Sequence, residues 1–222
     1  MARLAIVGIV LLLVGPILAT LELVPPFVGF VLYGVGGLLG LIAAIGGLVS
    51  LIRGRGVRAL ALAIVPAGIF VASFATGMDA PPINDIATNV DDPPAFVHAL
   101  TLPENAGRDF AYREDFKEVV RTAYPDLQAL RLARPPADVY AAVIDRMRAN
   151  GWAVTRDDAE QLTVEGVVTS KLFKFRDDVV VRVRADGEAA VVDMRSKSRD
   201  GIGDRGVNAA RIRAFLDALK SA

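Results

Sequence analysis

The sequence predicts a membrane-anchored α+β protein, in which an N-terminal region of three transmembrane helices precedes a compact domain with an antiparallel sheet covered by two helices. Two observations carry this prediction. Residues 1–78 contain five formally charged side chains, whereas the following 144 residues have the composition of an ordinary polar domain. In that second part, alternating apolar residues, an Asp-Gly turn and two amphipathic stretches are typical of hairpins and surface helices.

Three apolar segments in the first part are each long enough to cross a bilayer, which requires roughly 20 mostly apolar residues. Pro25-Pro26 separates the first two segments, because proline interrupts helical hydrogen bonding. The loop of residues 53–58 separates the second and third segments, and its three arginines are too costly to leave in hydrocarbon. The expected spans are about 4–24, 27–52 and 59–78.

The arginines also predict orientation, because short loops rich in Lys and Arg stay in the cytoplasm. Loop 53–58 and Arg3 are then cytoplasmic, and everything after Met78 faces the periplasm of a multi-pass inner (cytoplasmic) membrane protein. A cleaved signal peptide over residues 1–20 is the alternative, since Arg3 precedes an apolar run. It is disfavoured because Pro16 lies within the run and no small-x-small cleavage site follows.

The second span is rich in glycine, and Gly36 and Gly40 have the small-xxx-small spacing that lets helix backbones approach closely. We favour packing among the three helices of one chain over a dimerisation face, because short-linked spans must pack together. No span carries an acidic residue, His, Asn or Gln away from its ends. Transporters and proton pathways usually need such groups, so these functions are disfavoured.

The composition disfavours several kinds of site. The chain has no cysteine, which removes disulfides and thiol nucleophiles, and its one histidine, His98, leaves little for a zinc site or a Ser-His-Asp triad. Taking the four basic and one acidic residues of the first 78 from 25 of each in the chain leaves 21 basic and 24 acidic residues, or −3. This charge does not attract nucleic acid, and we expect no nucleic acid, cofactor or metal as a partner.

Residues 79–122 are predicted to form an irregular, Pro-rich connector, because residues before proline avoid the helical conformation. Apolar side chains, among them Phe96, Phe110 and Phe116, are too frequent here for a free linker. We therefore expect the connector to pack on the folded domain or lie on the membrane surface.

The α+β domain is predicted over residues 123–222, in the order strand, helix, four strands, helix. The first helix starts at Pro135-Pro136, with Asp138 in its first turn and Gly151 beyond its end, as helix termini favour. The last helix carries apolar residues at core spacing. The expected strands are 127–132, 152–156, 161–169, 177–184 and 189–196, and the last helix spans about 204–219.

The turn at Asp186-Gly187 predicts the register of the last hairpin, because a two-residue loop pairs its neighbours directly. One face of this hairpin is then apolar and the other charged. Two interpretations of the charged face remain open: a solvated surface held in register by ion pairs of ~0.2–1 kcal/mol each, or a polar recognition surface. The expected pairs are Ala185 with Glu188, Asp178 with Arg195 and, diagonally, Asp193 with Arg182.

Several segments of the second part form recognisable motifs: residues 81–88, 123–125, 150–152, 175–184, 193–201 and 203–213. Together they resemble the bacterial and plastid family called domain of unknown function 1499. The resemblance covers about residues 79–220 and is most specific in the last motif. It implies a domain boundary and no reaction, since the activity of the family is not established. Lys197 and Asp200 stand where small or apolar residues are commoner in that family, so no site is assigned to either.

Residues 201–206 spell G-x-G-x-x-G between a strand and a helix. A dinucleotide fold needs a further parallel strand and an acidic residue roughly 20 positions on, and only 16 residues follow Gly206. We prefer a glycine turn with Asp204 as the N-cap of the last helix. The free amides there, with arginines nearby, can hold a carboxylate or a phosphate.

Polar side chains of these motifs form the candidate binding site, and no catalytic residue is assigned. Asn208 and Arg211 lie one turn apart on one side of the last helix, from which they can reach the 177–178 end of the hairpin. The candidate binding residues are Asp177, Asp178, Arg182, Arg195, Ser196, Ser198, Arg199, Asp204, Asn208 and Arg211.

Two functions remain. The first is a membrane-tethered, non-catalytic binding or interaction module of the envelope, with the lipid bilayer and an envelope protein, an anionic lipid or a small anion as partners. The alternative is a membrane-tethered hydrolase that uses Asp177, Asp178, Ser196 or Ser198. We favour binding, because arginines hold the acids as ion pairs and no histidine is placed to activate a serine.

Overall fold

A computed structural model describes residues 1–221, and the chain divides into two compact units. The first unit comprises Met1–Met78 and Ser170–Phe175, and the second comprises Asp79–Thr169 and the residues from Arg176 onward. Each unit has a hydrophobic core of its own.

Apolar helices make up most of the first unit. Within residues 1–221, three helices are long and apolar enough to cross a membrane, as the sequence predicts: α1 (Ala2–Thr20), α2 (Pro26–Ile52) and α3 (Val57–Ala75). Helices α1 and α3 end several residues earlier than expected. Glu22 and Gly77, with φ of 57° and 72°, adopt left-handed conformations through which a helix does not continue.

Glycines bring the three helices close together. A Cβ atom on Gly36 would lie 2.7 Å from the carbonyl oxygen of Gly8 in α1, and one on Gly47 would lie 2.9 Å from the backbone nitrogen of Leu60 in α3. Larger side chains at these positions would therefore force the helices apart. The expected packing within one chain is confirmed at Gly36 and Gly47, whereas a Cβ on Gly34 meets nothing within 4 Å.

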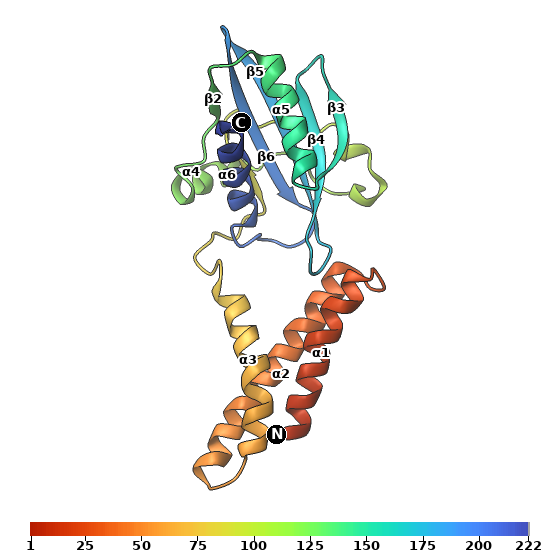
Figure 1. Cartoon of the computed structure of the whole chain (residues 1–222), viewed down its shortest axis with the longest axis vertical. Coiled ribbons are helices and arrows are strands. Elements are labelled where there is room, and N and C mark those ends of the chain that lie inside the picture. The colour runs from red at the N-terminus through yellow and green to blue at the C-terminus, as the bar shows by residue number, and fades with distance from the viewer. Residues whose placement is uncertain (222) are drawn as a thin grey trace. The chain divides into compact units, whose positions relative to one another are not determined.

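The second unit is built on a sheet that, over residues 1–221, has six antiparallel strands, which confirms the α+β class (Figure 1). Strands β6, β5, β4 and β3 lie side by side in that order, and β1 and β2 pair with different halves of the remaining edge of β6. This edge is thereby protected from association with another chain. The strands are β1 (Asp85–Ala87), β2 (Leu130–Leu132), β3 (Ala153–Asp158), β4 (Thr163–Thr169), β5 (Arg176–Asp186) and β6 (Ala189–Ser198).

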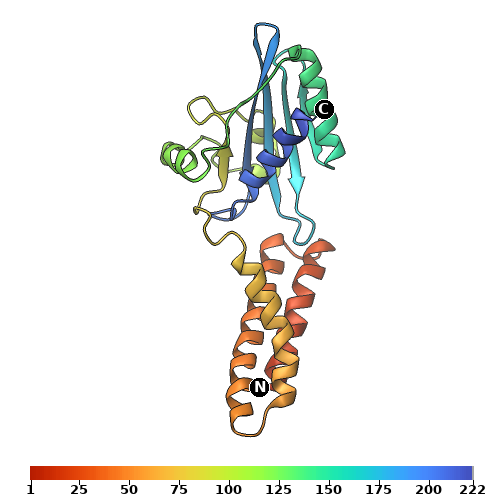
Figure 2. The same ribbon diagram turned by 60° about the vertical axis from the view of Figure 1, so that its left-hand side comes forward.

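Two helices, α5 (Pro136–Ala149) and α6 (Val207–Lys220), cover one face of the sheet (Figure 2). Their apolar stripes pack on inward-facing strand residues and form the main core. The single tryptophan, Trp152, stacks on Phe215 of α6 with ring centroids 5.1 Å apart. Buried side chains of this core include Val143, Met147, Ile212, Phe215, Val179, Val181, Val183 and Met194.

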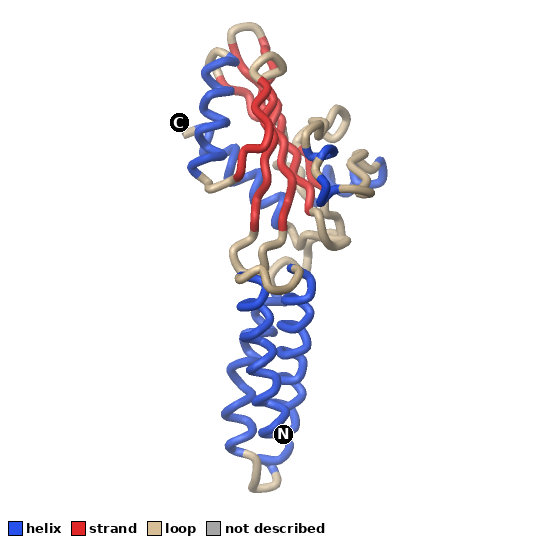
Figure 3. The backbone as a smooth tube through the Cα atoms, turned by 90° about the vertical axis from the view of Figure 1, so that its right-hand side faces the viewer, coloured by secondary structure: helices blue, strands red, loops and turns tan. Residues whose placement is uncertain are grey.

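The opposite face of the sheet is covered by residues 88–112, which we call the covering segment (Figure 3). This segment is largely irregular and includes the short 3-10 helices η1 (Ala99–Thr101) and η2 (Pro103–Asn105). Phe96, Ala99 and Phe110 pack on Val180 of β5 and form a second, smaller core. The central strands of the sheet are therefore covered on both faces.

A buried carboxylate anchors the covering segment. Glu165 of β4 accepts hydrogen bonds from the backbone N–H groups of Val97, His98 and Ala99 at 3.0, 2.8 and 3.0 Å. These amides open η1, where a negative charge is favourable. No side chain at the start of η1 caps it, and the carboxylate of Glu165 from β4 takes this role.

The connector is more regular than its proline content predicts, because it contains β1 and the helix α4 (Glu114–Ala123). Helix α4 is favoured by acidic residues in its first turn and by the i, i+4 spacing of Phe116 and Val120, which are both buried. Strand β1 forms because the C-terminal half of β6 offers it an open edge.

The β5–β6 hairpin turns one residue later than predicted. Gly187 and Glu188 are its two central residues, so Asp186 pairs with Ala189 and the predicted pairing of Ala185 with Glu188 is wrong. Of the two central residues, only Gly187 has a positive φ, 62°, which is the arrangement of a type II′ turn with glycine in first place.

This turn moves every predicted cross-strand partner by two positions. Asp178 lies opposite Lys197 and not opposite Arg195, while Arg182 lies directly opposite Asp193 and not diagonal to it. The predicted apolar face of the hairpin is confirmed, because a shift of two residues leaves each side chain on the same face of the sheet.

Candidate functional site

The sheet divides the predicted site residues between its two faces, because side chains alternate along a strand. Asp177, Ser196 and Ser198 face α6 and contact its polar side chains. Asp178 and Arg195 face the covering segment and bond to it. The predicted site therefore consists of separate networks.

The network on the α6 face is built around Asn208 and Arg211. The side-chain amide of Asn208 accepts a hydrogen bond from the Ser196 hydroxyl at 2.7 Å and donates one to the Ser198 hydroxyl at 3.0 Å. Arg211 donates to the Ser196 hydroxyl at 2.7 Å and forms an ion pair with Asp177. Helix α6 thus reaches the end of the hairpin through Asp177, and these five side chains satisfy one another.

Asp204 lies two residues before the N-cap position of α6 and accepts hydrogen bonds from amides at the start of the helix. Its carboxylate accepts the N–H groups of Gly206 at 2.8 Å and Asn208 at 2.7 Å. The residue directly before the helix is Gly206, with φ of 81°, so Asp204 is not the N-cap that the sequence predicts. Burial raises the pKa of the Asp204 carboxyl above its usual value, although both amides act in the opposite direction.

On the opposite face, Arg199 and Asp178 form a buried bidentate ion pair, with nitrogen–oxygen distances of 2.8 and 2.7 Å. Arg199 also contacts Glu104 of η2 at 3.2 Å, and the side-chain amide of Asn105 donates to Asp178 at 3.2 Å. The pair therefore joins the end of the β5–β6 hairpin to the covering segment.

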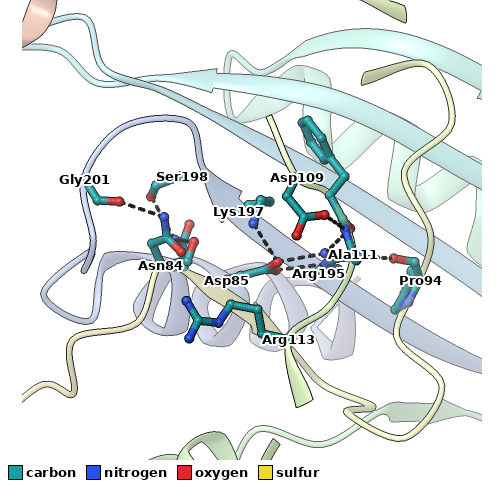
Figure 4. Close-up of polar contacts among 12 residues, drawn as sticks. Asn84, Asp85, Pro94, Asp109, Ala111, Arg113, Arg195, Lys197, Ser198 and Gly201 are labelled. Atoms are coloured by element: carbon teal, nitrogen blue, oxygen red, sulfur yellow. Dashed lines mark hydrogen bonds and ion pairs between the residues drawn. The ribbon is translucent and has the colours of Figure 1, made fainter. Parts of the chain in front are cut away.

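Arg195 pairs with Asp85 of β1, and not with Asp178 as the predicted register implies (Figure 4). Its Nε and Nη2 atoms lie 2.9 and 2.7 Å from the two carboxylate oxygens. Two backbone carbonyls and two aromatic rings surround the rest of the guanidinium group, which explains how a charge is accommodated at this depth. These contacts come from Pro94, Phe110, Phe96 and Tyr112.

Lys197 shares the carboxylate of Asp85 with Arg195. Its Nζ atom lies 3.1 Å from the Oδ2 atom of Asp85, so two cations face one anion (Figure 4). The side chain of Arg195 is 3% exposed, whereas that of Lys197 is 14% exposed. The excess positive charge therefore lies on the side chain that reaches solvent.

Arg182 belongs to a third group, further along the hairpin. It pairs with Asp193 of β6 at 3.1 Å and with Asp92 of the covering segment at 2.9 Å. Arg184 contacts the same Asp193 carboxylate at 2.8 Å. The predicted pairing of Arg182 with Asp193 exists, in the direct geometry that the observed register produces.

The charged face is buried, which neither interpretation of the sequence anticipates. Asp178, Asp193 and Arg195 are at most 2% exposed, because the covering segment lies over them. The sequence patterns gave no role to Asp85, which pairs with Arg195, or to Glu165, which anchors the covering segment. The signal for Asp85 is its position among the apolar residues of motif 81–88, which indicates burial.

Two cavities open beside these networks, and Asn84 lines both. The smaller, of about 220 Å³, has the basic residues Arg108, Lys197 and Arg199 in its wall, with two acidic residues. The larger, of about 440 Å³, is lined by five apolar side chains together with Asn84, Arg113 and Asp115. Arg108 and Arg199 are paired with Asp200 and Asp178, so the smaller cavity offers an anionic group mainly the ammonium of Lys197, which shares its carboxylate with Arg195.

The acidic residues do not form an evident metal centre. Over residues 1–221, no group of three or more His, Asp or Glu side chains is arranged to hold a metal ion. The glycine motif 201–206 follows β6 of an antiparallel hairpin, whereas dinucleotide binding uses a parallel βαβ unit.

A family model described as "Protein of unknown function (DUF1499)" matches residues 85–219. A search of curated proteins finds no match to the chain. The matched range begins at Asp85, the partner of Arg195, and includes the ten candidate binding residues. The resemblance that the sequence motifs indicate is thereby confirmed.

Proposed function

Because the chain belongs to the DUF1499 family of proteins of unknown function, we propose its role from its own structure: a membrane-tethered, non-catalytic binding module of the cell envelope. The apolar helices are the anchor, and the domain faces the periplasm. The ligand carries an anionic group, which binds in the smaller cavity beside Lys197.

Four arginines support the periplasmic placement of the domain. Arg53, Arg55 and Arg58 lie in or beside the loop between α2 and α3, and Arg3 lies at the start of α1. In a protein with three spans these positions share one side of the membrane, and basic short loops favour the cytoplasmic side. The domain that follows α3 then belongs on the other side.

The observation that carries the binding function is the excess cation at the smaller cavity. Lys197 and Arg195 share the single carboxylate of Asp85, and Lys197 lines the cavity. The two arginines of the wall are already paired, Arg108 with Asp200 and Arg199 with Asp178 and Glu104, so Lys197 is the cation that an anion would contact. An anion bound there would balance this charge and accept charge-assisted hydrogen bonds. A cavity of about 220 Å³ lies below the usual range for drug-sized ligands, so it suits a head group or a small anion.

The hydrolase alternative has less support, because its candidate groups are bound to one another. Ser196 is fully buried and donates its hydroxyl hydrogen to Asn208. Asp178 is held by two of the three side-chain nitrogens of Arg199. His98 belongs to the covering segment, on the other face of the sheet from Ser196, so it is not placed to act as its base.

The test uses the full chain in detergent and inorganic phosphate as the probe anion. Phosphate that binds the native state raises the unfolding midpoint, which Trp152 fluorescence reports. Lys197→Met should abolish this rise, and Asp85 keeps its bidentate bonds to Arg195 in that variant. Lys220→Met removes an exposed lysine of α6 and should preserve the rise.

Equal stabilisation of both variants, or none of the native chain, would contradict the proposal. Hydrolytic turnover that needs a metal ion and disappears in Asp177→Asn or Asp178→Asn would instead support the hydrolase.

A further inference from the structure

The larger cavity has the character of a site for a hydrocarbon chain. It lies between the residues before β1, helix α4 and the loop after β6, all within the second unit. Pro82, Ile83, Phe116, Val119 and Ile202 supply its apolar wall, while Asn84 and the ion pair of Arg113 with Asp115 add polar groups. Its volume of about 440 Å³ falls within the range of small-molecule sites, which are mostly apolar with a few polar groups.

Ile202 is an exposed apolar residue at the rim of this cavity. Its side chain is 85% exposed, although it lines the cavity. The side-chain amide of Asn84 donates to the carbonyl oxygen of Gly201 at 2.8 Å and holds the loop that carries Ile202 (Figure 4). An apolar ligand in the cavity would remove part of this surface from water, which is favourable.

The two cavities meet at Asn84 and differ in chemistry. Asn84 lines both the cavity with the apolar wall and the cavity with Arg108, Lys197 and Arg199. A ligand that fills both must combine a hydrocarbon chain with an anionic head. Neither a free anion nor an uncharged apolar molecule would use both surfaces.

We infer that the ligand is an anionic phospholipid of the surrounding bilayer, with its head group at Lys197 and one hydrocarbon chain in the cavity beside Val119. This inference rests on the proposed function and specifies its ligand. The chain's own anchor places the domain near a supply of such lipids. Pro82 follows the last residue of α3, Ala75, by seven positions, which span at most about 25 Å when extended.

The experiment uses the full chain in bilayers of phosphatidylcholine that contain a phosphatidylglycerol probe with a photoreactive group at the end of one chain. Cross-linked peptides are identified by mass spectrometry, which separates labelling of the cavity from that of the spans. We expect labelled peptides that contain Phe116 to Val119 and Ile202. Labelling confined to the transmembrane helices would overturn the inference.

Two variants test the apolar cavity. Val119→Phe fills it and should reduce cavity labelling by at least about tenfold, as the loss of ~1.4 kcal/mol of binding free energy would. Thr122→Phe places the same ring at an exposed position of α4 and should leave the labelling unchanged. Ile202→Asp, in an exposed loop, should also reduce it. Labelling of both cavity variants at the native level would refute the site.

The head-group arm compares the probe with a phosphatidylcholine probe that has the same chain. Lys197→Met should reduce labelling by the anionic probe at least about tenfold and leave the weaker labelling by the zwitterionic probe unchanged. Equal labelling of the native chain by both probes would overturn the head-group assignment. If phosphate stabilises the domain through Lys197 but no probe labels the cavity, the proposed function stands and the lipid inference fails. If both effects are absent, both fail.

Discussion

Arg195 of β6 and Asp85 of β1 form a buried bidentate ion pair between residues 110 positions apart in the sequence. Their side chains are 3% and 1% exposed. The pair holds β1 against β6. Lys197, which also contacts Asp85, lies beside the smaller cavity. One carboxylate therefore links the scaffold of the domain to its candidate binding site.

We predict that Asp85→Ala destabilises the domain by about 3–5 kcal/mol, because it leaves the buried guanidinium of Arg195 without its anion. The free energy of unfolding is measured on the full chain by denaturant titration of Trp152 fluorescence. Asp217→Asn breaks an exposed pair with Lys220 and should leave the midpoint nearly unchanged. Combining Asp85→Leu with Arg195→Met should recover part of the loss, and a double mutant no better than Asp85→Ala would contradict this account.

Glu165→Ala should detach the covering segment from the sheet. It leaves three backbone N–H groups without their acceptor, which costs at least about 2 kcal/mol. Amide hydrogen exchange of residues 97–99 should accelerate in the variant. Glu160→Ala removes an exposed acid beyond β3 and serves as the control. Unchanged exchange at residues 97–99 would show that Glu165 does not anchor the segment.

The buried carboxyl of Asp204 predicts a specific pH dependence. Burial raises its pKa above the ordinary value of 3.8, and the nearby Asp177 acts in the same direction. The native state therefore binds this proton more tightly than the unfolded state, so the contribution to stability is present below pH 3.8 and is lost as the pH rises through the native pKa. The stability of the native chain relative to Asp204→Asn should fall as the pH rises above about 4. Denaturant titrations between pH 3 and pH 7 measure this difference, and a difference that increases with pH would contradict the assignment.

Gly36→Leu should disrupt the packing of the helices, because a side chain there meets the backbone of α1. Gly34→Leu, in the same helix, adds the same side chain where nothing lies within 4 Å. We expect a lower temperature of aggregation in detergent for the first variant and a native value for the second. Equal behaviour of the two variants would argue against close glycine packing.

Orientation can be tested with a reporter that fluoresces only in the cytoplasm. A fusion after Ala222 should be dark, and a fusion after Arg55 should be bright, because three spans separate the domain from the cytoplasmic start of the chain. The reverse pattern would place the domain in the cytoplasm.

Local sequence patterns were sufficient for most elements of the fold. The spacing of apolar residues predicts α5 and α6, and the alternation in β5 and β6 predicts which side chains enter the core. The patterns failed at α4, whose local signals were outweighed by the proline content of the connector, and where an element depends on distant residues. Strand β1 is three residues long and exists because β6 pairs with it.

The contacts among the candidate binding residues were predicted in part. Arg211 reaches Asp177, as its position on α6 indicates. Arg195 and Asp178 have other partners, because the hairpin turns at Gly187-Glu188 and because Asp85 and Glu104 arrive from the connector. Lys197, to which the sequence assigned no role, lines the smaller cavity.

The sequence by itself determined the division into an apolar, glycine-packed region and a polar α+β domain, because hydropathy and side-chain alternation are properties of neighbouring residues. Only the tertiary structure decided that the charged face of the sheet is buried, and which carboxylate neutralises Arg195. An ion pair between positions 85 and 195 depends on strand pairing and on the desolvation that the covering segment imposes. Neither the strand pairing nor the desolvation can be read from a local pattern of residues.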